Sequence, residues 1–387
     1  MIEIIKIERK RILSKKIFLL FLSIIALFSV YDSYSMAKRY SIPSSEGVSV
    51  TWQENLEHAK ENLQGKSINR EFLSMMRQQR GEVGYLDERN LEELIYVNYE
   101  RKLLQDLSDD DIESFYSRRL SNIRAMLEES SLIRYTQEEI ERFMQSAAQV
   151  SEISFEYAEG WKVLNDGMGV FVALLLVLIS VLLLPLIGID PKNNMQELCR
   201  GTKYGKRQLD HARVLTAFLS GVFLYAFGIL LFFVIKMVPF GLGGWNQCIQ
   251  SSRNTFFSLY NITFFEQFLL NVMIGLVALL FVISLLLVIT VFMEKIMTSA
   301  VVFAFFLILL LLFDQMYLWP VNHYFANFMP LRMTDFSHYY TGNEVYRIFG
   351  CSMSVMSWSI LLSGLFAWGL LALAISWEKV KRKRGLY

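Results

Sequence analysis

The feature that most constrains this chain is a set of six apolar stretches, each close to or above the length needed to cross a bilayer. A transmembrane helix needs about 20 residues to cross about 30 Å of hydrocarbon. The expected spans are Ile17–Tyr34, Met168–Ile189, Ala212–Val238, Glu266–Phe292, Ser299–Trp319 and Met353–Trp377. The first is the weakest, and it counts as a span mainly because Phe18–Val30 contains no charge. The pattern predicts an all-α integral membrane protein with six transmembrane helices.

Composition agrees with this fold class. Charged residues make up 19% of the chain and hydrophobic residues 53%, whereas soluble domains average about 25% and about 45–50%. The average conceals two regions, since Met36–Asp166 is polar and acidic while most of the rest is apolar. A soluble enzyme is therefore not expected.

The N-terminus has a basic region before its apolar stretch, which fits either a cleaved signal peptide or a retained anchor. Tyr31-Asp32-Ser33-Tyr34 follows the apolar core, so the small-residue cleavage site of a signal peptide is missing. We therefore favour a retained anchor. Residues 1–16 place Ile and Leu among Lys and Arg, which predicts a cytoplasmic amphipathic helix lying on the inner membrane face.

Orientation follows from the excess of Lys and Arg in short cytoplasmic loops. The basic clusters are Lys6, Arg9, Lys10, Arg11, Lys15 and Lys16; Lys192, Arg200, Lys203, Lys206, Arg207 and Arg213; and Lys379, Lys381, Arg382, Lys383 and Arg384. All fall on one implied side, so both termini are expected in the cytoplasm. The expected organisation is an interface helix (1–16), transmembrane helix 1 (17–34), an extracellular domain (35–166), transmembrane helices 2–6 (167–377) and a basic cytoplasmic tail (378–387).

The extracellular domain carries helical signals. Thr51 with Glu54, and Thr136 with Glu139, have capping-box spacing. An apolar stripe of Ile112, Tyr116, Leu120, Ile123 and Leu127 predicts one helix between Asp109 and Ser130. We expect a bundle of about four or five helices, with Gln137–Glu159 leading straight into the second span.

Two properties of the outward-facing regions leave alternatives open. The acidic surface of the extracellular domain is either a field that gathers a cationic ligand or an ordinary solvated surface. Cys248 and Cys351 both lie in outward loops, and either form a disulfide or stay unpaired, because nothing in the sequence brings them within bonding distance. Cys199 falls in a cytoplasmic loop and should stay reduced.

Catalytic motifs are not found. Gly201 and Gly205 are separated by three residues instead of the four of a phosphate-binding loop, and Arg207 stands where Ser or Thr is needed. No H-E-x-x-H helix or G-x-S-x-G nucleophile elbow is present. Asp314 and Lys236 lie near span ends, where a charge costs little, so a proton-driven carrier is not indicated.

An aromatic segment, residues 320–352, precedes the sixth span. It is too polar to cross the bilayer and is broken by Pro320 and Pro330. It either dips partway into the outer leaflet, which requires protein or water to cover its backbone, or forms an ordinary loop packed on the extracellular domain.

Together these features resemble the permease subunits of type-2 ABC exporters, a family that includes bacterial peptide, antibiotic and sodium efflux permeases. The most specific likeness is the loop 190–211, in which a Glu is followed by a Thr-Lys-x-Gly-Arg-like run, a Leu and a basic residue. The residues in those places are Glu197, Arg200, Gly201, Thr202, Lys203, Tyr204, Gly205, Lys206, Arg207 and Leu209. Lys206 before Arg207 departs from the usual single Arg, and Arg213 stands where Lys is commoner.

In that family this loop forms a coupling helix that rests in a cleft of a separate ATP-binding subunit, and the resemblance implies the same here. Gly201 and Gly205 would permit the tight turns, and the basic side chains would meet acidic edges of the partner. Alternatively, these basic residues only fix topology. The large extracellular insert is found in only part of the family, so the usual substrates cannot be carried over.

The function that the resemblance implies is that of a non-catalytic ABC transporter permease in the cell membrane, with export as the expected direction. It would pair with a second permease copy or paralogue and with a cytoplasmic subunit that holds ATP and Mg²⁺, with no cofactor of its own and no nucleic acid partner. The substrate class is open, with peptides and amphiphiles the candidates. The alternative is a membrane receptor or scaffold that senses a ligand through its extracellular domain.

Overall fold

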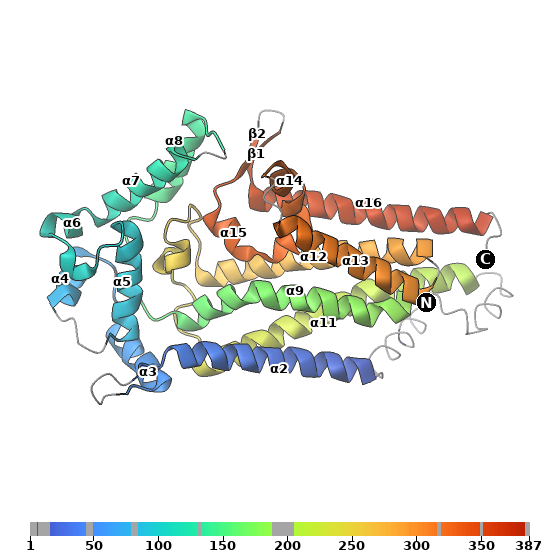
Figure 1. The fold of residues 1–387 in the computed structure, drawn as a ribbon, viewed down its shortest axis with the longest axis horizontal. Coiled ribbons are helices and arrows are strands. Elements are labelled where there is room, and N and C mark those ends of the chain that lie inside the picture. Colours follow the sequence, from blue (N-terminus) through green and yellow to red (C-terminus); the bar gives the residue numbers. More distant parts are fainter. Residues whose placement is uncertain are drawn as a thin grey trace.

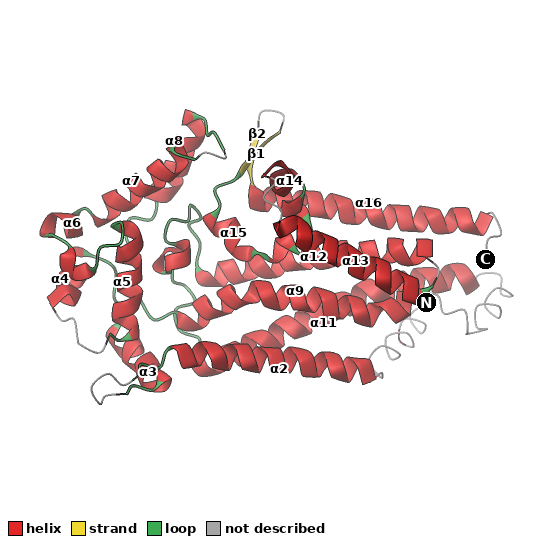
Figure 2. Cartoon of the chain, viewed as in Figure 1, coloured by secondary structure: helices red, strands yellow, loops and turns green. Residues whose placement is uncertain are grey.

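The computed structural model describes residues 6, 16–43, 49–78, 84–130, 133–187, 205–293, 295–315, 319–348 and 351–383. Within these ranges the protein is built of helices and one two-stranded hairpin (Figure 2). Long helices run side by side as a bundle, and a group of shorter helices covers one end of it (Figure 1).

Five helices in the described ranges are long and apolar enough to span a membrane, so the chain is a multi-pass membrane protein by length and composition. They are α2 (Lys16–Arg39), α9 (Glu159–Ile187), α11 (Gly205–Phe240), α12 (Phe264–Met293) and α16 (Val355–Lys383). The fifth expected span corresponds to α13 (Ile296–Gln315). Its apolar part, Ile296–Leu309, is shorter than the five helices above. Six spans therefore remain a prediction.

The bundle is held by apolar side chains and by glycines at helix contacts. A Cβ on Gly228 would lie 2.7 Å from a methyl carbon of Leu175, and one on Gly275 would lie 2.3 Å from the hydroxyl oxygen of Tyr225. Small residues of this kind let helices approach closely where lipid supplies no hydrophobic drive. As a result α11 packs closely on α9 and α12.

The start of α2 and the end of α16 lie at one end of the bundle, and the shorter helices lie at the other (Figure 1). This arrangement agrees with termini on one side of the membrane and the large insert on the other. Which side is cytoplasmic stays a prediction.

The insert between α2 and α9 folds as a helical domain, residues 49–158. Its helices are α3 (Trp52–Asn62), α4 (Arg70–Gln78), α5 (Leu86–Asn98), η1 (Leu104–Asp106), α6 (Asp109–Glu113), α7 (Phe115–Glu128) and α8 (Gln137–Ala148). Both expected capping boxes are present, at Thr51 with Glu54 and at Thr136 with Glu139.

Two expected features of this domain are corrected. The helix predicted between Asp109 and Ser130 is divided at Ser114, whose hydroxyl donates a hydrogen bond of 3.1 Å to the carbonyl of Asp111 and so competes with helical pairing. Gln137–Glu159 is also not continuous with the second span. Helix α8 ends at Ala148, and the residues before α9 are not helical: Ser154 forms an isolated β-bridge with Ser67, and Phe155 N–H donates to the Lys66 carbonyl.

Two connections cover the same end of the bundle. The loop between α11 and α12 contains η2 (Ile249–Ser251) and η3 (Arg253–Thr255). The aromatic segment contains α14 (Trp319–Tyr324), η4 (Ala326–Phe328), η5 (Arg332–Thr334), α15 (Phe336–Thr341), β1 (Val345–Ile348) and β2 (Cys351–Ser354). The two strands are antiparallel, with Val345 opposite Ser354.

Candidate functional site: a cavity under the aromatic segment

The aromatic segment packs into the bundle. Met333, Phe336 and Tyr340 are buried in the bundle core. The Tyr340 hydroxyl donates to Asn271 Oδ1 at 2.8 Å, and Asn271 Nδ2 donates to Asn165 Oδ1 at 3.2 Å, so a buried polar chain joins α15, α12 and α9. These contacts cover the backbone of the segment with protein, as a partly inserted segment requires.

The same segment also contacts the helical domain, and its entry into the outer leaflet stays a prediction. Arg347 on β1 forms an ion pair with Glu139 on α8, Nη2 to Oε2 2.6 Å, and the Tyr135 hydroxyl donates to the Asn343 carbonyl at 2.5 Å. The hydrogen bond from Arg347, together with the Thr136 cap, lowers the pKa of Glu139 to about 2. The hairpin is thus tied to the helical domain.

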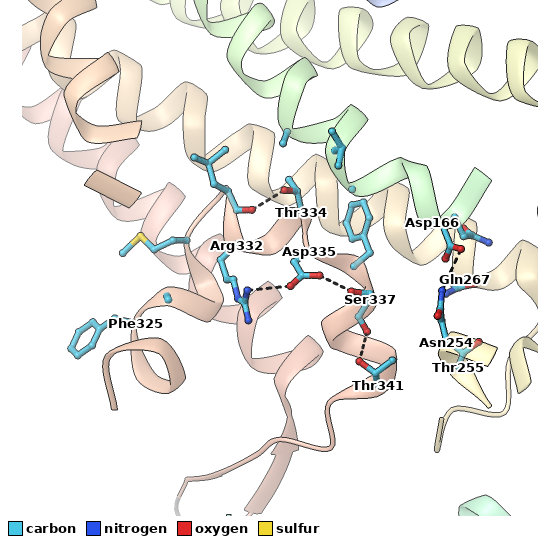
Figure 3. Close-up of a pocket in the computed structure, with 18 of the residues that line it drawn as sticks. Asp166, Asn254, Thr255, Gln267, Phe325, Arg332, Thr334, Asp335, Ser337 and Thr341 are labelled. Atoms are coloured by element: carbon cyan, nitrogen blue, oxygen red, sulfur yellow. Dashed lines mark hydrogen bonds and ion pairs between the residues drawn. The ribbon is translucent and has the colours of Figure 1, made fainter. Parts of the chain in front are cut away.

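Between the aromatic segment and the bundle lies a cavity of about 910 Å³ (Figure 3). Its walls are mostly apolar and come from α9, α13 and the aromatic segment. The apolar lining includes Val170, Ala173, Phe306, Leu309, Phe325 and Met329. Small-molecule sites typically measure about 300–1,000 Å³ and are lined in this way, with a few polar groups.

One polar group of the cavity is internally satisfied. Arg332 pairs with Asp335, Nη1 to Oδ2 3.1 Å, and Asp335 Oδ1 accepts a hydrogen bond of 2.7 Å from the Ser337 hydroxyl (Figure 3). The charges of this cluster therefore balance each other.

A second polar group lies where α9, α12 and η3 meet (Figure 3). It contains Asp166, Asn254 and Gln267. Asp166 is exposed to the cavity space, and among the described residues its hydrogen-bond partner is the Asn254 amide, Nδ2 to Oδ2 3.4 Å, with no ion pair. This carboxylate is consequently available to a ligand.

The close approach of the aromatic segment to α9 depends on Gly169. A Cβ at this position would lie 2.4 Å from the Thr334 carbonyl oxygen, a distance that would force η5 away from α9. Because both residues line the cavity, this glycine fixes its width.

A smaller cavity, of about 280 Å³, lies between the bundle and the helical domain and shares Asp166 and Asn254 with the first. Its wall includes buried Glu159 at the start of α9. Glu159 accepts from the Tyr40 hydroxyl and from Asn90 Nδ2, each at 2.8 Å, and pairs with Lys162 at 2.9 Å. Asp166 and Asn254 thus separate an apolar cavity from a charged one.

A buried ion pair lies beside this junction. Lys236 on α11 is fully buried, and its Nζ lies 2.5 Å from Asp32 Oδ2 on α2. Gly167 leaves room for the pair, since a Cβ there would be 3.1 Å from that oxygen and 3.4 Å from Nζ. The sequence indicates only a charge near a span end at Lys236, because its partner Asp32 lies 204 positions earlier and gives no local signal.

The predicted coupling loop is described only at its C-terminal end. Glu197, Arg200, Gly201, Thr202, Lys203 and Tyr204 lie outside the described residues. Gly205, Lys206, Arg207 and Leu209 form the first turns of α11, of which the backbone is described. This part of the expected loop is thus helical and continuous with a bundle helix.

Other expectations fall partly outside the described residues. The interface helix 1–16 is described only at Lys6 and Lys16, and the basic tail up to Lys383, the end of α16. Cys248 is a free cysteine whose pKa is raised by burial, so it forms no disulfide with Cys351. In the part of the chain that the structure describes, no group of three or more His, Cys, Asp or Glu could hold a metal ion.

Comparison with known proteins gave no match to a family model, to a curated protein or to a solved structure. The resemblance of loop 190–211 to ABC exporter permeases therefore rests on the sequence of the chain itself.

Proposed function

We propose that this protein is the permease subunit of an ABC exporter, driven by ATP hydrolysis on a separate cytoplasmic subunit. The observation that carries the proposal is the run from Glu197 to Leu209, placed between two long apolar helices and followed directly by α11. The permease itself performs no chemistry. ATP and Mg²⁺ are held by the partner.

The continuity of α11 supplies a physical route for the coupling. A helix of 36 residues is about 54 Å long at 1.5 Å per residue. Its last residue, Phe240, is buried in the core of the helical domain, where its carbonyl accepts a hydrogen bond of 2.8 Å from the Tyr157 hydroxyl. A displacement at Gly205 would therefore reach the helical domain through one rigid element.

In this proposal the permease pairs with a second copy or a paralogue, and closure of the ATP-binding subunits moves the Gly205 end of α11. Rigid-body rocking of this kind needs an element with two packed positions. Helix α11 contacts α2, α9 and α12, so its movement would change access to the cavity under the aromatic segment.

The test is co-expression with a candidate ATP-binding subunit from the same genome, followed by pull-down and an ATPase assay. Wild type is compared with the triple variant Lys203→Glu, Lys206→Glu, Arg207→Glu. The matched control, Lys381→Glu, Arg382→Glu, Lys383→Glu, makes the same charge change in the C-terminal tail. We expect the loop variant alone to lose association and stimulated ATPase activity.

Wild-type protein that purifies without an ATP-binding partner would refute the proposal and favour the receptor alternative. Equal loss in both variants would show that the effect is one of charge or topology and not of a specific loop contact.

A further inference from the structure

We propose that the cavity under the aromatic segment binds an amphiphile with a cationic head group, whose charge pairs with Asp166. Calling this ligand the exported substrate rests on the proposed function. The binding site itself does not, because it is argued from the geometry of the cavity.

The apolar part of the ligand is indicated by the cavity walls. Val170 and Ala173 on α9 face a space that is also lined by Phe306 and Leu309 on α13. Apolar walls of this kind suit an alkyl chain, and a volume of about 910 Å³ accommodates a small molecule. A folded peptide domain would not fit, so an amphiphile is favoured over a large peptide.

The sign of the head group is indicated by the difference between the two aspartates. Asp335 is already paired with Arg332 and accepts from Ser337. Asp166 forms no ion pair with a described residue. Because Asp166 is exposed and lines the cavity, its carboxylate can meet a cation there without displacing a charged partner.

An anionic head group would fit less well. It would be repelled by the Asp166 carboxylate, and the Arg332 guanidinium already pairs with Asp335 at 3.1 Å. The cavity thus discriminates between head groups of opposite charge.

Asp166 also marks where the two cavities meet. Asp166 and Asn254 line both cavities, and the smaller one is lined by acidic Glu93 and Glu159 and by basic Arg39, Arg89, Lys162 and Arg253. We therefore expect the cationic head group to stay beside Asp166, with its alkyl chain between α9 and α13.

The experiment uses the full chain in nanodiscs of phosphatidylcholine and measures binding of radiolabelled dodecyltrimethylammonium above that of empty nanodiscs. Dodecanol and dodecyl sulfate, which share the chain and differ in the head, serve as competitors. We expect saturable binding that dodecyl sulfate does not displace and that weakens as salt is added.

Asp166→Asn should weaken binding of the cation at least tenfold, while Asp110→Asn, an exposed carboxylate of the helical domain, should leave it unchanged. Ala173→Phe, which fills the apolar wall, should weaken the cation and dodecanol alike. Elution volume and Tm equal to wild type establish that Asp166→Asn is folded.

Equal affinity of wild type and Asp166→Asn, or displacement by dodecyl sulfate as strong as by unlabelled cation, would overturn the proposal. If the chain binds the cation but no ATP-binding subunit associates with it in the pull-down, the export function is refuted and the site stands. If the loop variant loses stimulated ATPase activity but the wild-type chain binds no cation, only the proposed binding site is refuted.

Discussion

The ion pair between Glu139 and Arg347 gives the sharpest prediction, because it is a charged contact that joins the helical domain to the hairpin. Its strength can be worked from the pKa of Glu139, which falls from an ordinary 4.5 to about 2. At about 1.36 kcal/mol per pKa unit this corresponds to at most about 3.4 kcal/mol. The Thr136 cap contributes part of it, and the Arg347 side chain is 47% exposed, so we expect a coupling of about 1–2 kcal/mol.

The perturbation is a double-mutant cycle with Glu139→Gln, Arg347→Gln and the double variant, which isolates the pairwise energy. Tm is measured in detergent by tryptophan fluorescence. At about 2–4 °C per kcal/mol, each single variant should melt about 2–8 °C below wild type, and the double variant should be no worse than the sum of the singles. Glu138→Gln, an exposed carboxyl in the same helical turn, should change Tm by less than about 2 °C.

The pH dependence has a definite sign. A carboxyl whose pKa is lowered on folding stabilises the protein fully above its unfolded value, and this stabilisation is lost as pH falls toward the folded value. The coupling should therefore be complete at pH 7 and reduced by more than half at pH 3. A coupling near zero at pH 7, or one equal at both pH values, would refute the reasoning.

Three further predictions concern packing. Gly160→Ala should lower stability by about 1–3 kcal/mol in thermal unfolding, because its Cβ would lie 2.3 Å from the Gly241 carbonyl oxygen, whereas Gly364→Ala, with nothing within 4 Å, should not. Arg119→Leu should lower Tm far more than Arg118→Gln, since buried Arg119 donates to the carbonyls of Phe256, Ala147 and Ser258 at 3.0–3.5 Å and an unmet buried acceptor costs about 1–3 kcal/mol. Lys236→Met should lower the free energy of unfolding by about 3–5 kcal/mol, because it leaves the Asp32 carboxylate without its partner. Adding Asp32→Asn should restore much of this stability in the same unfolding assay. A double variant as unstable as Lys236→Met alone would contradict an ion-pair role.

The features that could be predicted from the sequence are those encoded locally. Five of the spans follow from uninterrupted apolar runs, and the capping boxes at Thr51 and Thr136 follow from residues three positions apart. The break at Ser114 was missed because the apolar stripe continues across it: Ile112, Ile123 and Leu127 are all buried. Periodicity reports which face is buried and not whether the backbone stays helical.

The candidate site could not be predicted, because its members come from elements far apart in the chain. Asp166 lies at the expected boundary between the extracellular domain and the second span, where a charge is common. It becomes part of a cavity wall only when Asn254 of the α11–α12 loop and the aromatic segment pack beside it. Asp32 and Lys236 each lie toward the end of an apolar helix and become a buried pair only when α2 packs on α11.

The two proposals meet at one point of the bundle. Gly167 follows Asp166 directly, and a Cβ there would lie 3.1 Å from Asp32 Oδ2 of α2 and 3.4 Å from Lys236 Nζ of α11, so the pair lies against this turn of α9. A buried ion pair tolerates little change in geometry, because separating the charges leaves each one desolvated without compensation. If α11 is displaced from its Gly205 end, the pair and the adjoining turn of α9 must therefore move with it, and that turn carries the carboxylate that faces the cavity. An event at the predicted coupling loop would in this way change the charge environment of the ligand head group without any direct contact between the two sites.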